Sequence, residues 1–159
     1  MSKNKLTLFL ILSFFIFTSC TKTVVYKDET TFANANWTFE NKAVTFNVPL
    51  TRSEKPYAII LELDLTGTPN VDLMNATFSI FTPQGGKTIK PIVFNFLSPQ
   101  EPYIKGASAN EKIYRLTVYP KKYFSETGTY TIIVDQFSHK ADNYGIRALR
   151  LRVEKVKEK

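Results

Sequence analysis

Few side chains of this 159-residue chain belong to the types that catalyse reactions or bind metals. His139 is the only histidine and Cys20 the only cysteine, so neither a histidine-based metal cluster nor a thiol nucleophile within a folded site is expected. A serine triad would have to use His139, but the sequence has no Gly-x-Ser-x-Gly elbow. His139 lies in a polar stretch, residues 138–143, that is typical of a surface loop. The sequence therefore predicts no catalytic residue, no metal site and no cofactor.

Glu62 and Asp64 are the two carboxylates whose spacing invites comparison with a glycoside hydrolase. Such an enzyme needs two carboxyl groups that face each other across the scissile bond. Side chains two residues apart on a strand share one face, and in a half-buried strand the acidic face is normally the solvated one. We therefore expect Glu62 and Asp64 to be exposed surface residues and the chain not to be an enzyme. An open cleft with two facing carboxyls would favour the enzymatic alternative.

Cys20 is placed for a different chemistry, the attachment of lipid. Residues 1–5 carry two lysines and no acid, and residues 6–17 are apolar except for Thr7 and Ser13. This run is shorter than the roughly 20 apolar residues that cross a bilayer, so cleavage fits better than spanning. Residues 17–20, Phe-Thr-Ser-Cys, resemble the lipobox of bacterial lipoproteins, although phenylalanine stands where leucine is usual. We predict a lipoprotein signal peptide over 1–19 and lipidation of Cys20; an ordinary secretory peptide or an N-terminal anchor helix is the alternative.

The length and charge of the mature chain limit the number of its domains and the kinds of its partners. Removing residues 1–19 takes away Lys3 and Lys5 and no acid, so the net charge falls from +7 to +5 over the 140 remaining residues. A chain of this length forms one domain with its own core and needs no disulfide. Its basic residues are scattered along the sequence, so nucleic acid is not an expected partner. We predict a lipidated tether over 20–33, a single domain over 34–155 and a basic tail over 156–159.

The dominant period of the mature sequence is two, which indicates β-strands. From Tyr57 to Leu65 every second residue is apolar, and Glu62 and Asp64 alternate with them. Segments rich in Gly, Pro, Asn or Asp separate the strands, as chain reversals require. The expected fold is all-β: an antiparallel β-sandwich, jelly-roll-like, of about eight strands. The other predicted strands are 37–40, 43–48, 76–81, 89–97, 112–119, 130–137 and 146–153.

Four tyrosines in or near predicted loops could form a binding surface. Carbohydrate-binding sandwiches stack sugars on exposed aromatic rings, but tyrosines also plug the ends of sandwiches with the ring buried and the hydroxyl in water. Both interpretations remain open, and a glycan-binding or adhesin-type lipoprotein is the alternative function that depends on these residues. The possible binding aromatics are Tyr103, Tyr119, Tyr123 and Tyr144.

Several motifs of the mature chain occur in an order and spacing that resembles one known family. A tryptophan enters a predicted strand at Trp37, an asparagine precedes another at Asn75, and a Pro-x-Gly turn follows at 83–85. Residues 124–130 lead into the strand 130–136, and Tyr144-Gly-Ile leads into the last strand. This ordered set resembles the gliding motility lipoprotein H family (GldH) of the Bacteroidetes. Residues 98–106 and the pair at 137–138 depart from the pattern of that family.

The resemblance implies an accessory lipoprotein of the cell envelope, needed for gliding over surfaces and for the coupled protein secretion, without catalysis. Its partners would be the membrane, through lipid on Cys20, and other envelope lipoproteins or subunits of the secretion and motility machinery, through edge strands or aromatic loops. Residues 21–27 carry no acid, whereas surface-exported lipoproteins of that phylum tend to carry acids just after the cysteine. We therefore expect a domain anchored on the outer membrane and facing the periplasm.

Overall fold

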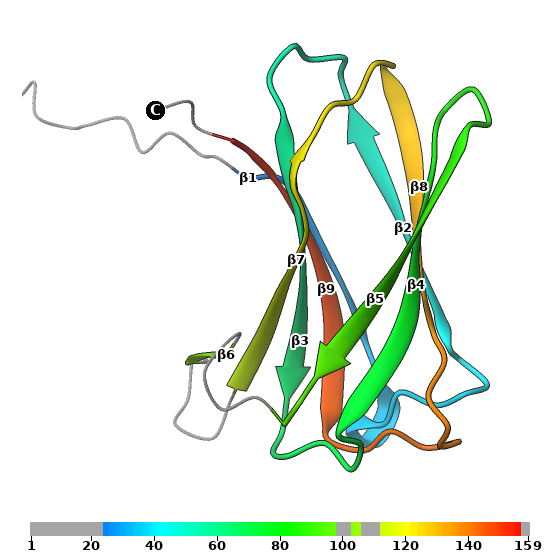
Figure 1. Ribbon diagram of the computed structural model, residues 1–159, viewed down its shortest axis with the longest axis vertical. Coiled ribbons are helices and arrows are strands. Elements are labelled where there is room, and N and C mark those ends of the chain that lie inside the picture. The colour runs from blue at the N-terminus through cyan, green and yellow to red at the C-terminus, as the bar shows by residue number, and fades with distance from the viewer. Residues whose placement is uncertain (1–23, 98–102, 106–111, 157–159) are drawn as a thin grey trace, which may run out of the picture.

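Nine β-strands and one short 3-10 helix form the part of the chain that the computed structural model describes, which is residues 24–97, 103–105 and 112–156. The long strands lie in two facing layers (Figure 1). The elements are β1 (Val24–Thr31), the helix η2 (Ala33–Ala35), β2 (Ala43–Leu50), β3 (Tyr57–Leu65), β4 (Leu73–Phe81), β5 (Lys87–Asn95), β6 (Tyr103–Lys105), β7 (Lys112–Lys122), β8 (Gly128–Gln136) and β9 (Ile146–Lys155).

The strands form two antiparallel sheets, with orders β1-β9-β3-β7-β6 and β2-β8-β4-β5. If the three-residue strand β6 is left out, successive strands alternate between the two sheets. The one exception is β5, which follows β4 in the same sheet and forms a hairpin with it. This is the strand order of the jelly roll, in which eight strands form two Greek keys. The predicted antiparallel, jelly-roll-like β-sandwich is confirmed.

Alternation along the strands builds the hydrophobic core between the sheets. On β2 the residues Val44, Phe46, Val48 and Leu50 are buried, and the residues between them are exposed. The apolar residues predicted to share one face of β3 are likewise buried. Aromatic side chains from both sheets fill much of the space, among them Phe78 and Phe94 of the smaller sheet and Tyr114 of the larger.

Trp37 is fully buried but does not lie on a strand, so the strand predicted over 37–40 is wrong. Its amide donates to the carbonyl of Asn143 at 3.2 Å, and its indole Nε1 donates to the carbonyl of Asn41 at 3.1 Å. The ring stacks on Phe32 with 5.0 Å between the centroids. The amide of Trp37 therefore bonds to a loop rather than to a sheet, its indole bonds to a turn, and Trp37 closes one end of the core.

Residues 24–31 are strand β1, which pairs with β9 along its length. The tether predicted over 20–33 is therefore wrong from Val24 onward, because these residues belong to the sandwich that was predicted to start at 34. The sequence signal was weak because β1 is the edge of its sheet, where Lys27, Asp28 and Glu29 are exposed. The predicted signal peptide, Cys20 and residues 157–159 of the predicted tail lie outside the described residues. In the part of the chain that is described, no helix has the length and apolar character to cross a membrane.

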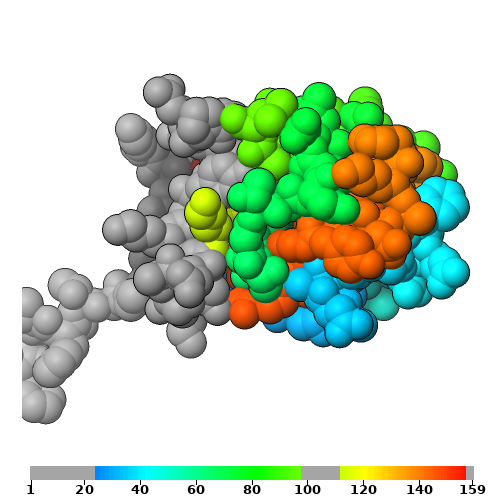
Figure 2. Space-filling model, turned by 90° about the horizontal axis from the view of Figure 1, so that it is seen from below, coloured from blue at the N-terminus to red at the C-terminus, as the bar shows by residue number. Residues whose placement is uncertain are grey.

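The loops gather at two ends of the sandwich, which we call the upper and lower ends as they stand in Figure 1. The upper end comprises the loops 51–56, 82–86 and 123–127, the start of β1 and the end of β9. The lower end comprises the segments 32–42, 66–72 and 137–145, which pack side by side in Figure 2. The first described residue, Val24, therefore lies at the upper end.

Candidate binding surfaces

Glu62 lies on the outer face of the larger sheet, yet its side chain is only 3% exposed. Arg115 on β7 donates to its Oε1 from Nε at 2.9 Å and from Nη2 at 2.5 Å. From β9, Arg152 donates to Oε1 at 3.1 Å and Arg150 to Oε2 at 3.3 Å. The predicted exposure of Glu62 is therefore wrong, because three arginines from the neighbouring strands cover it.

The remaining carboxylates of this face are paired in the same way. Asp64, also predicted to be exposed, is 8% exposed and accepts hydrogen bonds from Arg147 Nε at 3.1 Å and Nη2 at 2.6 Å. Arg150 donates to Glu29 of β1, and Arg152 donates to Glu154 of β9. We call this set the arginine network: Glu29, Glu62, Asp64, Arg115, Arg147, Arg150, Arg152 and Glu154. Its four positive and four negative charges balance, so the face offers little net charge to a partner.

The electrostatics of Glu62 do not suit a catalytic acid. Burial by itself would raise the pKa of Glu62, but the hydrogen bond and charge of Arg115, the charge of Arg152 and the hydrogen bond of Arg150 outweigh burial and lower it. Burial would likewise lower the pKa of Arg150, but its bonds to Glu29 and Glu62 raise it. A glycosidase acid needs the opposite arrangement, a carboxyl with a raised pKa. The lowered pKa of Glu62 therefore does not suit the general-acid role.

The outer face of the smaller sheet has a different composition, and we call it the uncharged face. It presents Ala43, Thr45, Asn47 and Pro49 of β2; Thr129, Thr131, Ile133 and Asp135 of β8; Leu73, Asn75, Thr77, Ser79 and Phe81 of β4; and Lys87, Ile89, Pro91, Val93 and Asn95 of β5. Within these four strands, Asp135 and Lys87 are the only outward charged residues. Ile89 is 55% exposed, Leu73 48% and Val93 46%.

Strand β5 ends the smaller sheet, and its composition limits uncontrolled pairing. Pro91 lies in the middle of this edge strand and lacks an amide hydrogen. Lys90 points inward, where Nζ donates to the carbonyl of Val118 at 2.6 Å and lies 4.6 Å from the ring centroid of Tyr119. An inward charge and a proline are devices that keep a second chain from adding to a sheet edge. The side chains of the uncharged face remain available to a partner.

Two exposed phenylalanines border the uncharged face at the lower end. Phe39 is 51% exposed and Phe137 48% exposed. Lys42 Nζ lies between them, 5.1 Å from the ring centroid of Phe39 and 5.3 Å from that of Phe137, and 3.9 Å from the carboxylate of Asp135. Sequence reasoning missed this pair, because residues 39 and 137 come together only through the packing of two loops.

The predicted binding tyrosines do not form one patch. Tyr123 is 62% exposed at the upper end, whereas Tyr144 is 51% exposed at the lower end. Tyr119 is partly buried and packs edge-on against Phe78, with 6.1 Å between ring centroids. Tyr103 lies on β6 opposite Tyr114, toward the lower end, and its side chain is outside what the structure describes. His139 is exposed, as predicted for a surface loop.

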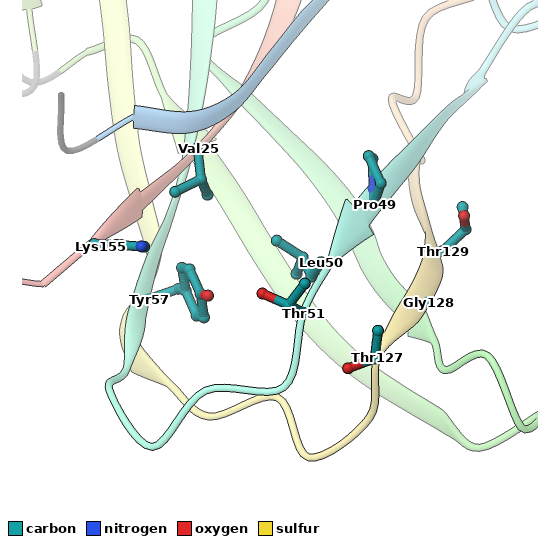
Figure 3. A pocket seen from close by; sticks show the side chains of 9 residues that line it. All are labelled: Val25, Pro49, Leu50, Thr51, Tyr57, Thr127, Gly128, Thr129 and Lys155. Carbon is teal, nitrogen blue, oxygen red and sulfur yellow. The ribbon is translucent and has the colours of Figure 1, made fainter.

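A pocket opens between the two sheets at the upper end (Figure 3). It has a volume of about 410 Å³, and its lining combines Leu50 and Tyr57 with the threonines at 51, 127 and 129. Lys155 of β9 and Val25 of β1 also line the pocket. The described residues contain no cluster of His, Cys, Asp or Glu that could hold a metal ion.

Comparison with known proteins adds little to this geometry. No protein-family model and no curated protein matches the chain. A solved X-ray structure of a carbohydrate-binding module specific for non-crystalline cellulose, CBM28, matches it with 16% sequence identity and a TM-score of 0.41, over 82% of this chain and 72% of that one. A likeness of this degree carries no argument about function.

Proposed function

We propose that this chain is a lipid-anchored, non-catalytic lipoprotein of a bacterial cell envelope that binds a protein partner through its uncharged face. The observation that carries the proposal is the contrast between the two outer faces of the sandwich. The charges of the arginine network pair with one another on the larger sheet. The uncharged face instead leaves Leu73, Ile89 and Val93 about half exposed to water. Exposed apolar side chains among polar, uncharged ones favour a protein contact.

The lipid on Cys20 would set the orientation of this face. Only three residues separate Cys20 from Val24, the first residue of β1. A fully extended chain of that length reaches at most about 14 Å, so the upper end of the sandwich would stand close to the bilayer. The uncharged face would then be turned sideways along the membrane, toward other proteins of the same leaflet. Confinement to one surface raises the effective concentration of such partners.

In its finer form, the proposal is an accessory or scaffold component of gliding motility and of the protein secretion coupled to it. The motif order that resembles the GldH family supports this form, as does a domain without a catalytic arrangement among the residues described. The location proposed with it is the outer membrane, facing the periplasm. Protease treatment of intact cells should then leave the domain uncut, whereas cleavage would place it on the cell surface.

Site-specific photo-crosslinking in the native cells tests the proposed face. A photoreactive amino acid at Ile89, on the uncharged face, should crosslink to another envelope lipoprotein or to a secretion or motility subunit. The matched control is the same amino acid at Thr117, an exposed position on the outer face of the larger sheet. Adducts from Thr117 but not from Ile89, with the protein still in the membrane, would contradict the proposal.

Glycan binding is the second candidate, and the exposed pair Phe39 and Phe137 favours it. Two exposed aromatic rings beside a cation and a carboxylate could stack on sugar rings and bind their hydroxyls. A glycan array identifies a ligand if this function holds, and the double variant F39A/F137A should then lose it. Retention of glycan binding by that variant would exclude this pair as the site.

A further inference from the structure

The two ends of the sandwich differ in charge. The upper end carries the cations Arg52, Lys55, Lys87, Lys121, Lys122 and Lys155, against the acids Glu54, Glu126 and Glu154. Two of these acids already accept hydrogen bonds, Glu154 from Arg152 and Glu126 from the amide of Gln84. Among the described residues, Arg52, Lys121 and Lys155 have no carboxylate within ion-pair distance. The upper end is therefore basic.

The lower end has no such excess of positive charge. Its described residues include the cations Lys42, Lys105, Lys112 and Lys140 and the acids Glu40, Asp72, Asp135 and Asp142, so the two signs balance. Lys42 lies 3.9 Å from Asp135, and Lys140 donates to the carbonyl of Asn70. Most of the positive excess of the described residues thus lies at the end where β1 begins.

We propose that the upper end is a membrane-contact surface that binds the phosphate headgroups of the bilayer holding the lipid of Cys20. This inference rests on the proposed lipid anchor. A span of at most about 14 Å from Cys20 to Val24 is less than two Debye lengths of about 8 to 10 Å at physiological ionic strength. The cations of the upper end are therefore held where an anionic surface attracts them.

Two further features of the upper end fit a bilayer surface. Tyr123 is 62% exposed beside Lys121 and Lys122, and tyrosine favours the headgroup region, where its ring is apolar and its hydroxyl stays wet. The pocket at this end opens among threonine side chains, with Lys155 in its lining (Figure 3). Hydroxyl and ammonium groups can donate hydrogen bonds to phosphate oxygens.

The orientation is measured on the full-length lipoprotein in vesicles. Because Cys20 is the only cysteine and carries the lipid, one introduced cysteine can be labelled alone. Y123C and Y144C replace exposed tyrosines at opposite ends, and each receives a fluorophore. Vesicles of phosphatidylcholine, with or without phosphatidylglycerol, carry a nitroxide quencher on the headgroup. The label at 123 should be quenched several-fold more than the label at 144, and more strongly with phosphatidylglycerol.

Charge reversal separates a headgroup contact from the effect of the tether alone. K121E/K155E should reduce the quenching at 123 toward that at 144. K112E/K140E, which changes the net charge equally at the lower end, should leave it unchanged. Equal quenching of the two labels, or no response to phosphatidylglycerol and to K121E/K155E, would overturn the headgroup contact. Failure to float with vesicles, with an unmodified mass at Cys20, would instead overturn the anchor and this inference with it.

Discussion

Arg115 on β7 donates two hydrogen bonds to a single oxygen of Glu62 on β3, from Nε at 2.9 Å and from Nη2 at 2.5 Å. Arg150 and Arg152 of β9 approach the same carboxylate from the other side. The strands β7 and β9 both pair with β3 but not with each other. The carboxylate of Glu62 therefore links three strands across the outer face of the sheet.

Replacing Glu62 by glutamine should destabilise the fold. E62Q keeps the size of the side chain but leaves three arginines without their shared countercharge. The expected loss in the free energy of unfolding is about 3 kcal/mol, as when one partner of a buried ion pair is removed. Denaturant unfolding, followed by the fluorescence of the single tryptophan Trp37, measures it. The matched control E154Q removes a more exposed partner of Arg152 and should cost less than about 1 kcal/mol. Equal losses would contradict this account.

Acid should remove the contribution of Glu62. Its pKa is lower in the folded state than in the unfolded state, in spite of burial, because of Arg115, Arg152 and Arg150. A lowered folded-state pKa gives stability that is present above the unfolded value, about 4.3, and is lost as pH falls through the folded value. The difference in unfolding free energy between the native chain and E62Q should therefore shrink below about pH 4. A difference that does not change with pH would show that Glu62 does not act through its charge.

The sequence predicted the inner face of β3 correctly and its outer face wrongly. Period-two alternation is a pattern within a short stretch of sequence, so it predicts that the face with Leu61 and Leu63 is buried. The burial of Glu62 depends on Arg115 and Arg150, which lie 53 and 88 residues away in the sequence. Without the strand order, nothing in the sequence shows that arginines from two other strands cover this acid.

Edge and loop positions were missed for a related reason. Strand β1 carries three consecutive exposed charged residues, and only its pairing with β9 shows that it belongs to the sandwich. The interpretation of Trp37 as part of a strand used its aromatic character, but its indole and amide bond to Asn41 and Asn143. The basic upper end could not be predicted, because its cations come from four separate segments of a sequence in which they appear scattered.

Lys90 should limit self-association through β5. K90M removes the inward charge and its bond to the carbonyl of Val118, while a side chain of similar length still covers Tyr119. The edge strand then resembles an ordinary apolar strand that a second copy can extend. We expect sedimentation velocity to show dimers or larger species at concentrations where the native chain is monomeric. K87M, at an outward position of the same strand, is the control and should not associate. A monomeric K90M that unfolds at the native midpoint would contradict this role.

Gly128 should tolerate a methyl group worse than Gly85 does. Both have positive φ, +147° and +89°, so alanine strains the backbone at either position. At Gly128 the added Cβ would also lie 2.8 Å and 2.9 Å from two ring carbons of Pro83, whose ring cannot rotate away, whereas nothing lies within 4 Å at Gly85. We expect G85A to cost about 1 kcal/mol and G128A about 3 kcal/mol in unfolding free energy. Equal costs in denaturant unfolding would mean that the 82–86 turn moves freely against β8, and that the upper end is less rigid than its packing indicates.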